Sequence, residues 1–142
     1  MLKAVLDTNV IVSAIITGKG IPFQLLQAWR TREWDLVISP RLLPEVERVL
    51  SVPKIARVYT ITRQDITDLI RLFTYRATIV SEHLAIPRTV RDHEDDHILA
   101  CAKEGEVDYI VSGDQDLLTL TSYERIPILT PAAFAALLKA SR

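Results

Sequence analysis

Four acidic residues that lie far apart in the chain each fall at an end of a predicted secondary-structure element. Asp7 and Asp114 follow apolar runs that are typical of buried strands, whereas Glu45 and Asp96 lie near the start of helical patterns. In a parallel α/β sheet, strand C-termini and helix N-termini share one edge, where ligands bind. Carboxylates gathered at that edge would repel each other unless a cation neutralised them. The arrangement therefore predicts a divalent metal site and metal-assisted chemistry.

Each strand-end or helix-start acid also has a purely structural interpretation when it is taken alone. Either Asp7 or Thr8 suits the N-cap of the helix that follows, and Asn9 would then be a nearby amide able to hold a carboxylate or a water. Glu45 suits the solvated face of an amphipathic helix. Asp114 suits an N-cap as well, and this role is compatible with metal binding.

The densest polar cluster in the chain spans residues 91–97. Its four acids fall within five positions, namely Asp92, Glu94, Asp95 and Asp96. The positive end of a helix dipole favours one or two acids at a helix start. Four acids so close together repel each other, and this favours a functional role for the cluster.

A zinc-protease pattern is also present within this cluster. His93, Glu94 and His97 match HExxH, in which two histidines bind zinc and the glutamate activates a water. Here the pattern lies at a predicted helix start, and the only other histidine, His83, precedes it. A third histidine ligand downstream is therefore missing, and the strand-end acids would have no role. We prefer the carboxylate site.

The predicted elements that position these residues alternate along the chain. Strands are expected at 3–6, 36–38, 78–80, 108–112 and 126–129. Helices are expected at about 9–17, 22–32, 44–52, 62–75, 94–104 and from 131 onward. This alternation predicts an α/β fold in which helices cover both faces of a central parallel sheet of four to five strands, a three-layer α/β/α architecture. One domain over residues 1–142 suits a chain of this length.

Four residues carry local predictions at these element ends. Ser39 suits a cap for the helix that holds Glu45. Pro44 would delete a hydrogen bond if it lay one turn inside that helix, so we expect the helix to begin near Pro44, and Pro53 marks its end. Gly113 is expected to permit a tight turn or a close backbone approach.

Charge is distributed unevenly along a chain whose net charge is only −1. That net charge gives no overall attraction to nucleic acid or to an anionic membrane. Residues 30–76 contain nine Lys or Arg against six Asp or Glu, whereas residues 77–142 contain six against eleven. We therefore expect any nucleic-acid contact to involve the middle of the chain, although solvated helix faces would give the same pattern.

The single cysteine and the apolar runs bear on the cellular setting. Cys101 has no partner for an intrachain disulfide and lies in an apolar stretch, which fits a buried residue in a reducing compartment. We reject a signal peptide, because Asp7 and Asn9 interrupt the N-terminal apolar run. No run reaches the roughly 18 apolar residues of a membrane span. A cytoplasmic protein with no membrane association is expected.

Four segments taken together resemble the PIN-domain family, in particular the VapC-like branch described as toxin components of toxin–antitoxin systems. In chain order they are Val5-Leu6-Asp7-Thr8-Asn9-Val10, Ser39-x-x-Leu42-Leu43-x-Glu45-x-x-x-Val49-Leu50, Asp92-x-x-Asp95-Asp96-x-Ile98-Leu99-Ala100-x-Ala102 and Asp108-Tyr109-Ile110-Val111-Ser112-Gly113-Asp114-x-Asp116-Leu117-Leu118. His93-Glu94 and Pro44 depart from the pattern of that branch without removing an acid.

The resemblance implies a PIN-like fold and a metal-dependent ribonuclease, the toxin of a bacterial or archaeal pair. Carried over by motif, its catalytic and metal-binding acids are Asp7, Glu45, Asp96 and Asp114. Asp96 is preferred over Asp95 because its spacing to Ser112-Gly113-Asp114 fits the family pattern. The accessory residues are Asn9, Asp92, Asp95, Ser112 and Asp116.

The resemblance also implies a cofactor and partners. Mg²⁺ or Mn²⁺ suits the acid set, because either ion acidifies a bound water and clamps the phosphoryl anion. The expected partners are an RNA substrate, a small antitoxin protein and a second copy of the chain. The apolar faces of helices 21–32 and 62–75 would suit a protein partner, but we expect them to form core.

Two further functions stay open. A receiver-type phosphorylation module also has an acidic pocket on an α/β domain, but it needs a Lys at the end of the last strand, and Ile128-Leu129-Thr130-Pro131 has none. A PIN-like nucleic-acid-binding protein without useful catalysis would share the fold, and the complete acid set argues against it.

Overall fold

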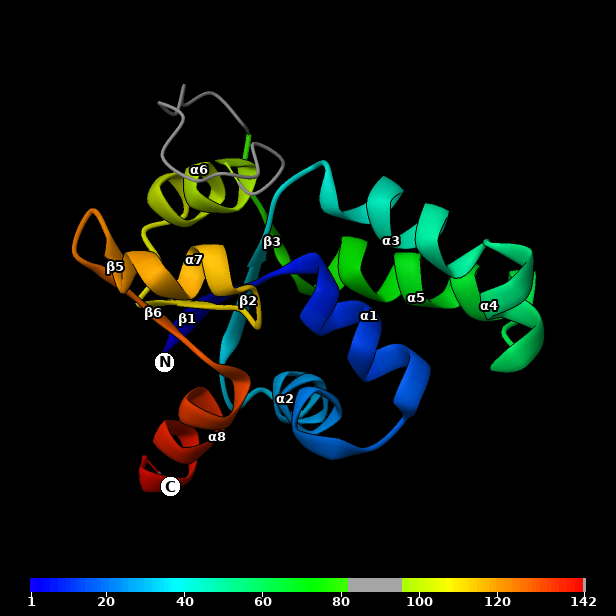
Figure 1. Ribbon diagram of the computed structural model, residues 1–142, viewed down its shortest axis with the longest axis horizontal. Helices are drawn as coiled ribbons and strands as arrows, with labels where there is room; N and C mark the ends of the chain where they lie inside the picture. Colours follow the sequence, from blue (N-terminus) through cyan, green and yellow to red (C-terminus); the bar gives the residue numbers. More distant parts are fainter. Residues whose placement is uncertain (82–95, 142) are drawn as a thin grey trace.

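The computed structural model describes residues 1–81 and 96–141, and of Asp96 it gives only the place in a helix. Within that part of the chain, six strands form one sheet in the order β3-β2-β1-β4-β6-β5 (Figure 1). Neighbouring strands are parallel from β3 to β6, and β5 pairs antiparallel with β6. The strands are β1 (Lys3–Leu6), β2 (Asp35–Ile38), β3 (Thr78–Ile79), β4 (Tyr109–Val111), β5 (Ser122–Tyr123) and β6 (Ile126–Leu129).

Helices cover both faces of the sheet because strand side chains alternate between two apolar cores. Ala4 and Leu6 face the larger core, with α1, α2, α3, α5 and α8, whereas Val5 and Ile110 face the smaller core, with α6 and α7. The described helices are α1 (Thr8–Thr17), α2 (Gly20–Arg30), α3 (Leu42–Leu50), α4 (Pro53–Val58), α5 (Arg63–Arg76), α6 (Asp96–Glu104), α7 (Gln115–Leu120) and α8 (Pro131–Ala140).

The predicted three-layer architecture with a parallel sheet is confirmed. The strands expected at 3–6 and 126–129 have those bounds. The expected number of strands, four to five, was too small because β5 was missed. Glu124 and Arg125 join β5 to β6 with φ of 50° and 68°. Hairpin turns usually place Gly or Asn in this left-handed conformation, so the residue types did not indicate the turn.

The strand order reverses between β1 and β4, which are neighbours near the middle of the sheet. From β1 the sheet extends to β2 on one side, and it extends from β4 to β6 on the other. In open α/β sheets, ligands bind beyond the C-terminal ends of the strands at such a reversal. The residues that immediately follow these two strands are Asp7 and Ser112.

The start of α3 lies near Pro44, as expected, but its cap differs from the prediction. The helix begins at Leu42, two residues before Pro44, and its N-cap is Arg41 rather than Ser39. The first four N–H groups of a helix have no intrahelical partner, so Pro44 in the first turn removes no hydrogen bond. Pro53, which was expected only to follow the end of this helix, begins the unpredicted helix α4.

The apolar faces of α2 and α5 are core, as expected. Trp29 of α2 and Phe73 of α5 are both buried, and their rings stack with centroids 5.3 Å apart. Exposed positions remain at the margins of these helices, such as Tyr75. Among the described residues, no single helix has the length and apolar composition to cross a membrane, and α1 with α2 passes that test only as a pair bent by 97°.

Candidate active site

Asp7 is a buried acid at the junction of β1 and α1. Its backbone N–H donates to the carbonyl of Val111 across 2.9 Å, which ties the end of β1 to β4. Asp7 occupies the N-cap of α1, but its side chain forms no capping hydrogen bond. Its Oδ2 instead accepts a hydrogen bond of 2.8 Å from the hydroxyl of Ser112. The residue is only 4% exposed, so the fold buries a carboxyl group that it does not use to cap the helix.

Burial raises the pKa of Asp7 above its ordinary value of 3.8, because the charged form loses hydration. The Ser112 hydroxyl and the adjacent backbone N–H of Asn9 lower the pKa, but less strongly. The charge of Asp114 raises it, and His97 lowers it. Within residues 1–81 and 96–141, no Lys or Arg forms an ion pair with Asp7. A cation bound here would therefore offset a charge that no described Lys or Arg neutralises.

Ser112 connects Asp7 to the second strand-end acid. Its buried hydroxyl donates to Asp7 and accepts from the backbone N–H of Asp114 across 2.9 Å. Oδ1 of Asp114 accepts from the N–H of Asp116 across 2.8 Å, so the predicted capping role of Asp114 is confirmed for α7. A Cβ at Gly113 would meet no described atom within 4 Å, and its φ is not left-handed. Among the described residues, no close approach therefore requires glycine at this position.

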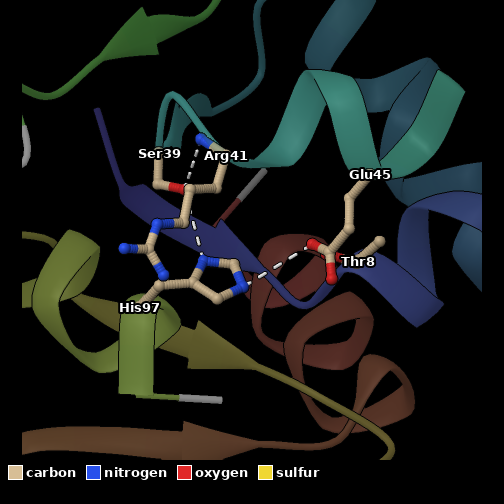
Figure 2. Close-up of polar contacts among 5 residues, drawn as sticks. All are labelled: Thr8, Ser39, Arg41, Glu45 and His97. Atoms are coloured by element: carbon tan, nitrogen blue, oxygen red, sulfur yellow. Dashed lines mark hydrogen bonds and ion pairs between the residues drawn. The ribbon is translucent and has the colours of Figure 1, made fainter. Parts of the chain in front are cut away.

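A second set of polar contacts joins side chains from four segments (Figure 2). The hydroxyl of Thr8, at the start of α1, donates to Oε2 of Glu45 in α3 across 2.9 Å. Nε2 of His97 in α6 lies 3.6 Å from the same oxygen, an electrostatic contact longer than a hydrogen bond. Nδ1 of His97 lies 3.3 Å from Oγ of Ser39, which follows β2. The imidazole thus lies between two residues that are distant in sequence, and its side chain is only 9% exposed.

Both ring nitrogens of His97 face an oxygen atom. The backbone N–H of Arg41 donates to Oγ of Ser39 across 3.2 Å, and the Ser39 hydroxyl proton can then be donated to Nδ1. In that arrangement a proton on Nε2 would point toward Oε2 of Glu45. Thr8 and His97 both approach Oε2 of Glu45, and Oε1 has no hydrogen-bond partner among the described residues. One carboxylate oxygen is therefore held while the other is left for a ligand.

The two sets of contacts bring three of the four predicted acids to one edge of the sheet. Asp7 and Asp114 share Ser112, and Glu45 is bound by the residue that follows Asp7. Asp96 begins α6, which packs against β1 and β2, and its neighbour His97 contacts Glu45. The side chain of Asp96 lies outside the described residues.

The predicted accessory residues are described only in part. Ser112 contacts Asp7 directly, and Asn9 is exposed with its backbone N–H next to that carboxyl. The half-buried Asp116 binds Asp114 through its N–H. Asp92 and Asp95 lie outside the described residues, as do His93 and Glu94 of the zinc pattern.

The donor set fits a hard divalent cation better than a transition metal, because it consists of carboxylate oxygens with hydroxyl support. No group of three acidic, histidine or cysteine side chains within residues 1–81 and 97–141 is arranged to hold a metal ion. Mg²⁺ keeps several waters and needs only one or two protein carboxylates. Buried Asp7, to which no described Lys or Arg is paired, is the observation that supports a cation at this edge.

A parallel α/β sheet with acids at the reversal of strand order is typical of domains that bind or hydrolyse a ligand at that edge. Comparison with known proteins identifies the family. The PIN domain model matches residues 3–116, so this chain belongs to the PIN-domain family. PIN domains have a nuclease fold, and such nucleases typically use divalent metals such as Mg²⁺.

One relative of this chain is an uncharacterized archaeal protein. Protein MJ1680 of Methanocaldococcus jannaschii is 29% identical over 119 residues, which cover 84% of this chain and 75% of that protein. No solved structure gives a significant match to the chain. The family is therefore established by the PIN domain match, and the archaeal relative adds no function.

Three contacts around Glu45 were not predicted. Thr8 and His97 contact Glu45, and Ser39 contacts His97. Thr8 and Ser39 were considered only as caps, and His97 only as a zinc ligand. Each of them follows a strand or begins a helix at the same edge of the sheet. That shared position was visible in the sequence, but which side chain would meet Glu45 was not.

Proposed function

We propose that this protein is a metal-dependent endoribonuclease that hydrolyses RNA phosphodiester bonds. The observation that carries the proposal is Asp7, a buried acid of raised pKa at the reversal of the strand order in a PIN-domain sheet. Its burial costs folding free energy and serves no cap. Residues whose pKa is perturbed in this way cluster at functional sites.

The proposed roles divide the acids between holding a cation and orienting a water. Asp7 and Asp96 would hold the principal metal, and Glu45 and Asp114 would orient the attacking water or hold a second metal. Mg²⁺ or Mn²⁺ would acidify that water and stabilise charge on the phosphoryl oxygens. Asn9, Asp92, Asp95, Ser112 and Asp116 are proposed accessories.

The hydrogen bonds of the described residues support this division. Ser112 holds Oδ2 of Asp7, and this fixes the carboxyl plane at the end of β1. Thr8 and His97 hold Oε2 of Glu45, and this fixes the rotamer of a side chain that is otherwise partly exposed. Groups held in this way need little reorganisation when the substrate binds.

The test is cleavage of a panel of single-stranded RNAs by the purified protein with Mn²⁺, Mg²⁺ or EDTA, beside Asp96→Asn. Metal-dependent cleavage that the variant loses is the expected result. Mn²⁺ binding without cleavage of any panel member would indicate a narrow RNA target, which a library of cellular RNA then identifies. Neither binding nor cleavage would contradict the proposal in favour of a nucleic-acid-binding protein without catalysis.

We further propose that the nuclease acts in the cytoplasm as the toxin of a toxin–antitoxin pair, as a homodimer covered by a small antitoxin protein. The four motifs of the VapC-like branch support this role. An apolar groove between α1, α2 and α5 offers a surface for a protein partner, and it is lined in part by Ile15, Phe23, Leu26, Leu69 and Leu72. Growth arrest on expression, absent in Asp7→Asn cells, is the expected result, and unimpaired growth would contradict the toxin role.

A further inference from the structure

We propose that α4, its flanking turns and Arg48 in the last turn of α3 form a docking surface for single-stranded RNA. The proposal rests on the ribonuclease function above and adds the surface that holds the substrate strand beyond the cleavage site. We call this the α4 surface and define it by Arg48, Lys54, Arg57, Val58 and Tyr59.

Apolar side chains of the α4 surface are exposed to solvent instead of being packed in a core. Helix α4 has no buried residue, although it packs beside α3. Val58 is 64% exposed and Tyr59 is 50% exposed. Large apolar side chains that gather on an exposed element mark sites of interaction.

The charge of this segment is of one sign. From Arg48 to Arg63 the chain contains no Asp or Glu. Arg63 is already paired with Glu47 at 2.8 Å. Arg48, Lys54 and Arg57 are exposed, and none of them forms an ion pair with a described residue. Three exposed cations without an ion-pair partner among the described residues therefore lie within eleven residues of the exposed Tyr59 in the sequence.

This combination favours RNA over a second copy of the chain. A two-fold dimer places the same patch on both sides of the interface. The cations of one copy would then face the same cations of the other, and like charges across an interface oppose association. A phosphate backbone neutralises such cations and releases its counterions. The ring of Tyr59 offers a stacking platform for a base of any sequence.

The α4 surface is connected to the candidate active site by α3. This helix carries Glu45 in its first turn, and α4 follows its C-terminal end, on the far side from α6 (Figure 1). About 8 Å of helix axis separates Glu45 from Leu50 at 1.5 Å per residue. A stacked strand with roughly 3.4 Å per nucleotide spans that distance in about two or three nucleotides. A strand cut at the site can therefore reach the α4 surface.

The first test measures RNA affinity without cleavage. Fluorescence anisotropy of a labelled 12-nucleotide single-stranded RNA is followed in EDTA at several salt concentrations. The α4 triple variant is Arg48→Gln, Lys54→Gln and Arg57→Gln. A matched control removes three exposed cations elsewhere, Lys3→Gln, Arg125→Gln and Lys139→Gln. We expect the α4 triple to bind more weakly and to lower the salt slope by about 2, at about 0.7 per phosphate contact, while the control keeps the wild-type slope.

The second test separates stacking from charge. Tyr59→Ser removes the ring, and we expect RNA binding to weaken on the order of 10-fold. Tyr59→Phe keeps the ring and should bind like the wild type. Both changes are at an exposed position, and circular dichroism tests whether the variants are folded.

The outcomes distinguish this proposal from the ribonuclease itself. Equal weakening in both triple variants would overturn the α4 surface in favour of unspecific charge attraction. A wild-type dimer that the α4 triple converts to monomer, with RNA binding intact, would overturn it in favour of a second copy. Cleavage by the α4 triple with the wild-type KM would overturn it and leave the ribonuclease standing. RNA binding that depends on α4, with neither Mn²⁺ binding nor cleavage of any cellular RNA, would support the surface and contradict the ribonuclease.

Discussion

Helices α1 and α5 both begin beside an aspartate, but the two carboxyl groups are treated in opposite ways. At α5, Thr62 and Asp65 form a reciprocal capping box: the N–H of Asp65 donates to the Thr62 hydroxyl, and the N–H of Thr62 donates to the Asp65 carboxylate. At α1, Asp7 is the N-cap residue but does not cap, and its carboxyl meets Ser112 from another strand.

The pKa values of the two carboxyl groups are shifted in opposite directions. Backbone and hydroxyl hydrogen bonds from Thr62 lower the pKa of exposed Asp65, whereas burial raises the pKa of Asp7. An aspartate at a helix start thus stabilises the fold as the N3 residue of α5, whereas as the N-cap residue of α1 it is buried at a cost in folding free energy. A carboxyl group that is buried without capping its helix is available for a ligand, and this is the physical mark of the candidate site.

The largest expected effect is on catalysis. Asp7→Asn should lower metal-dependent RNA cleavage by roughly 10²–10³-fold or more, as the loss of one catalytic stabilising group does. Asp65→Asn makes the same chemical change at the start of α5 and should leave cleavage at the wild-type rate. Initial rates on one RNA substrate with Mn²⁺ measure both. Equal losses in the two variants would remove the distinction between the two helix starts.

An intermediate effect is expected at His97, which holds Glu45. His97→Leu should weaken Mn²⁺ binding on the order of 10-fold, because residues that orient a metal ligand typically change affinity by that factor or more. His97→Gln keeps an N–H donor and should recover much of the loss. Calorimetric titration with Mn²⁺ measures binding without cleavage, and Ile98→Val, a change in the adjacent core residue, is the control. Wild-type affinity in a folded His97→Leu protein would show that the contact with Glu45 has no such role.

A smaller effect is expected at the α5 cap. Thr62→Ala removes the hydroxyl that accepts from the Asp65 N–H and should lower the free energy of unfolding by about 1 kcal/mol. The corresponding change in Tm is about 3 °C, measured by thermal denaturation in EDTA. Thr67→Ala, in which an exposed hydroxyl bonds only within the same helix, is the control. A Tm unchanged from wild type in Thr62→Ala would mean that the capping box adds nothing to stability.

The smallest expected effect is on the pH dependence of stability in the metal-free protein. The contributions of Asp7 and Asp65 change with pH in opposite directions. The raised pKa of Asp7 means that its contribution to stability is present below about pH 3.8 and is lost as pH rises through the folded pKa. The lowered pKa of Asp65 means that its contribution is present above about pH 3.8 and is lost as pH falls through the folded pKa.

Urea unfolding in EDTA from about pH 3 to 8 measures this difference. Asp7→Asn should gain stability relative to the wild type as pH rises, whereas Asp65→Asn should lose stability relative to the wild type as pH rises. If Asp7→Asn became less stable than the wild type at neutral pH, the buried carboxylate would have a compensating partner, and the comparison of the two helix starts would fail.

Most elements of the fold could be predicted because their signals are local. An apolar run ending in Asp7 predicted β1 to the residue, and Thr130-Pro131 predicted the start of α8. Helix α4 was missed because Pro53 was taken only as a stop. The β5–β6 hairpin was missed because Glu124 and Arg125 are unusual in a left-handed turn.

The residue types of the candidate site could be predicted from the sequence, but the contacts between their side chains could not. The sequence by itself determined that acids follow β1 and β4 and lie at the start of α3 and α6, because strand ends and helix starts are marked by local patterns. Only the tertiary structure decided that Ser112 bonds to Asp7, 105 residues away, and that His97 lies between Ser39 and Glu45. Contacts of that kind depend on strand order and on how helices pack across the sheet. Strand order and helix packing are set by the long-range burial of the two cores, which no short stretch of sequence encodes.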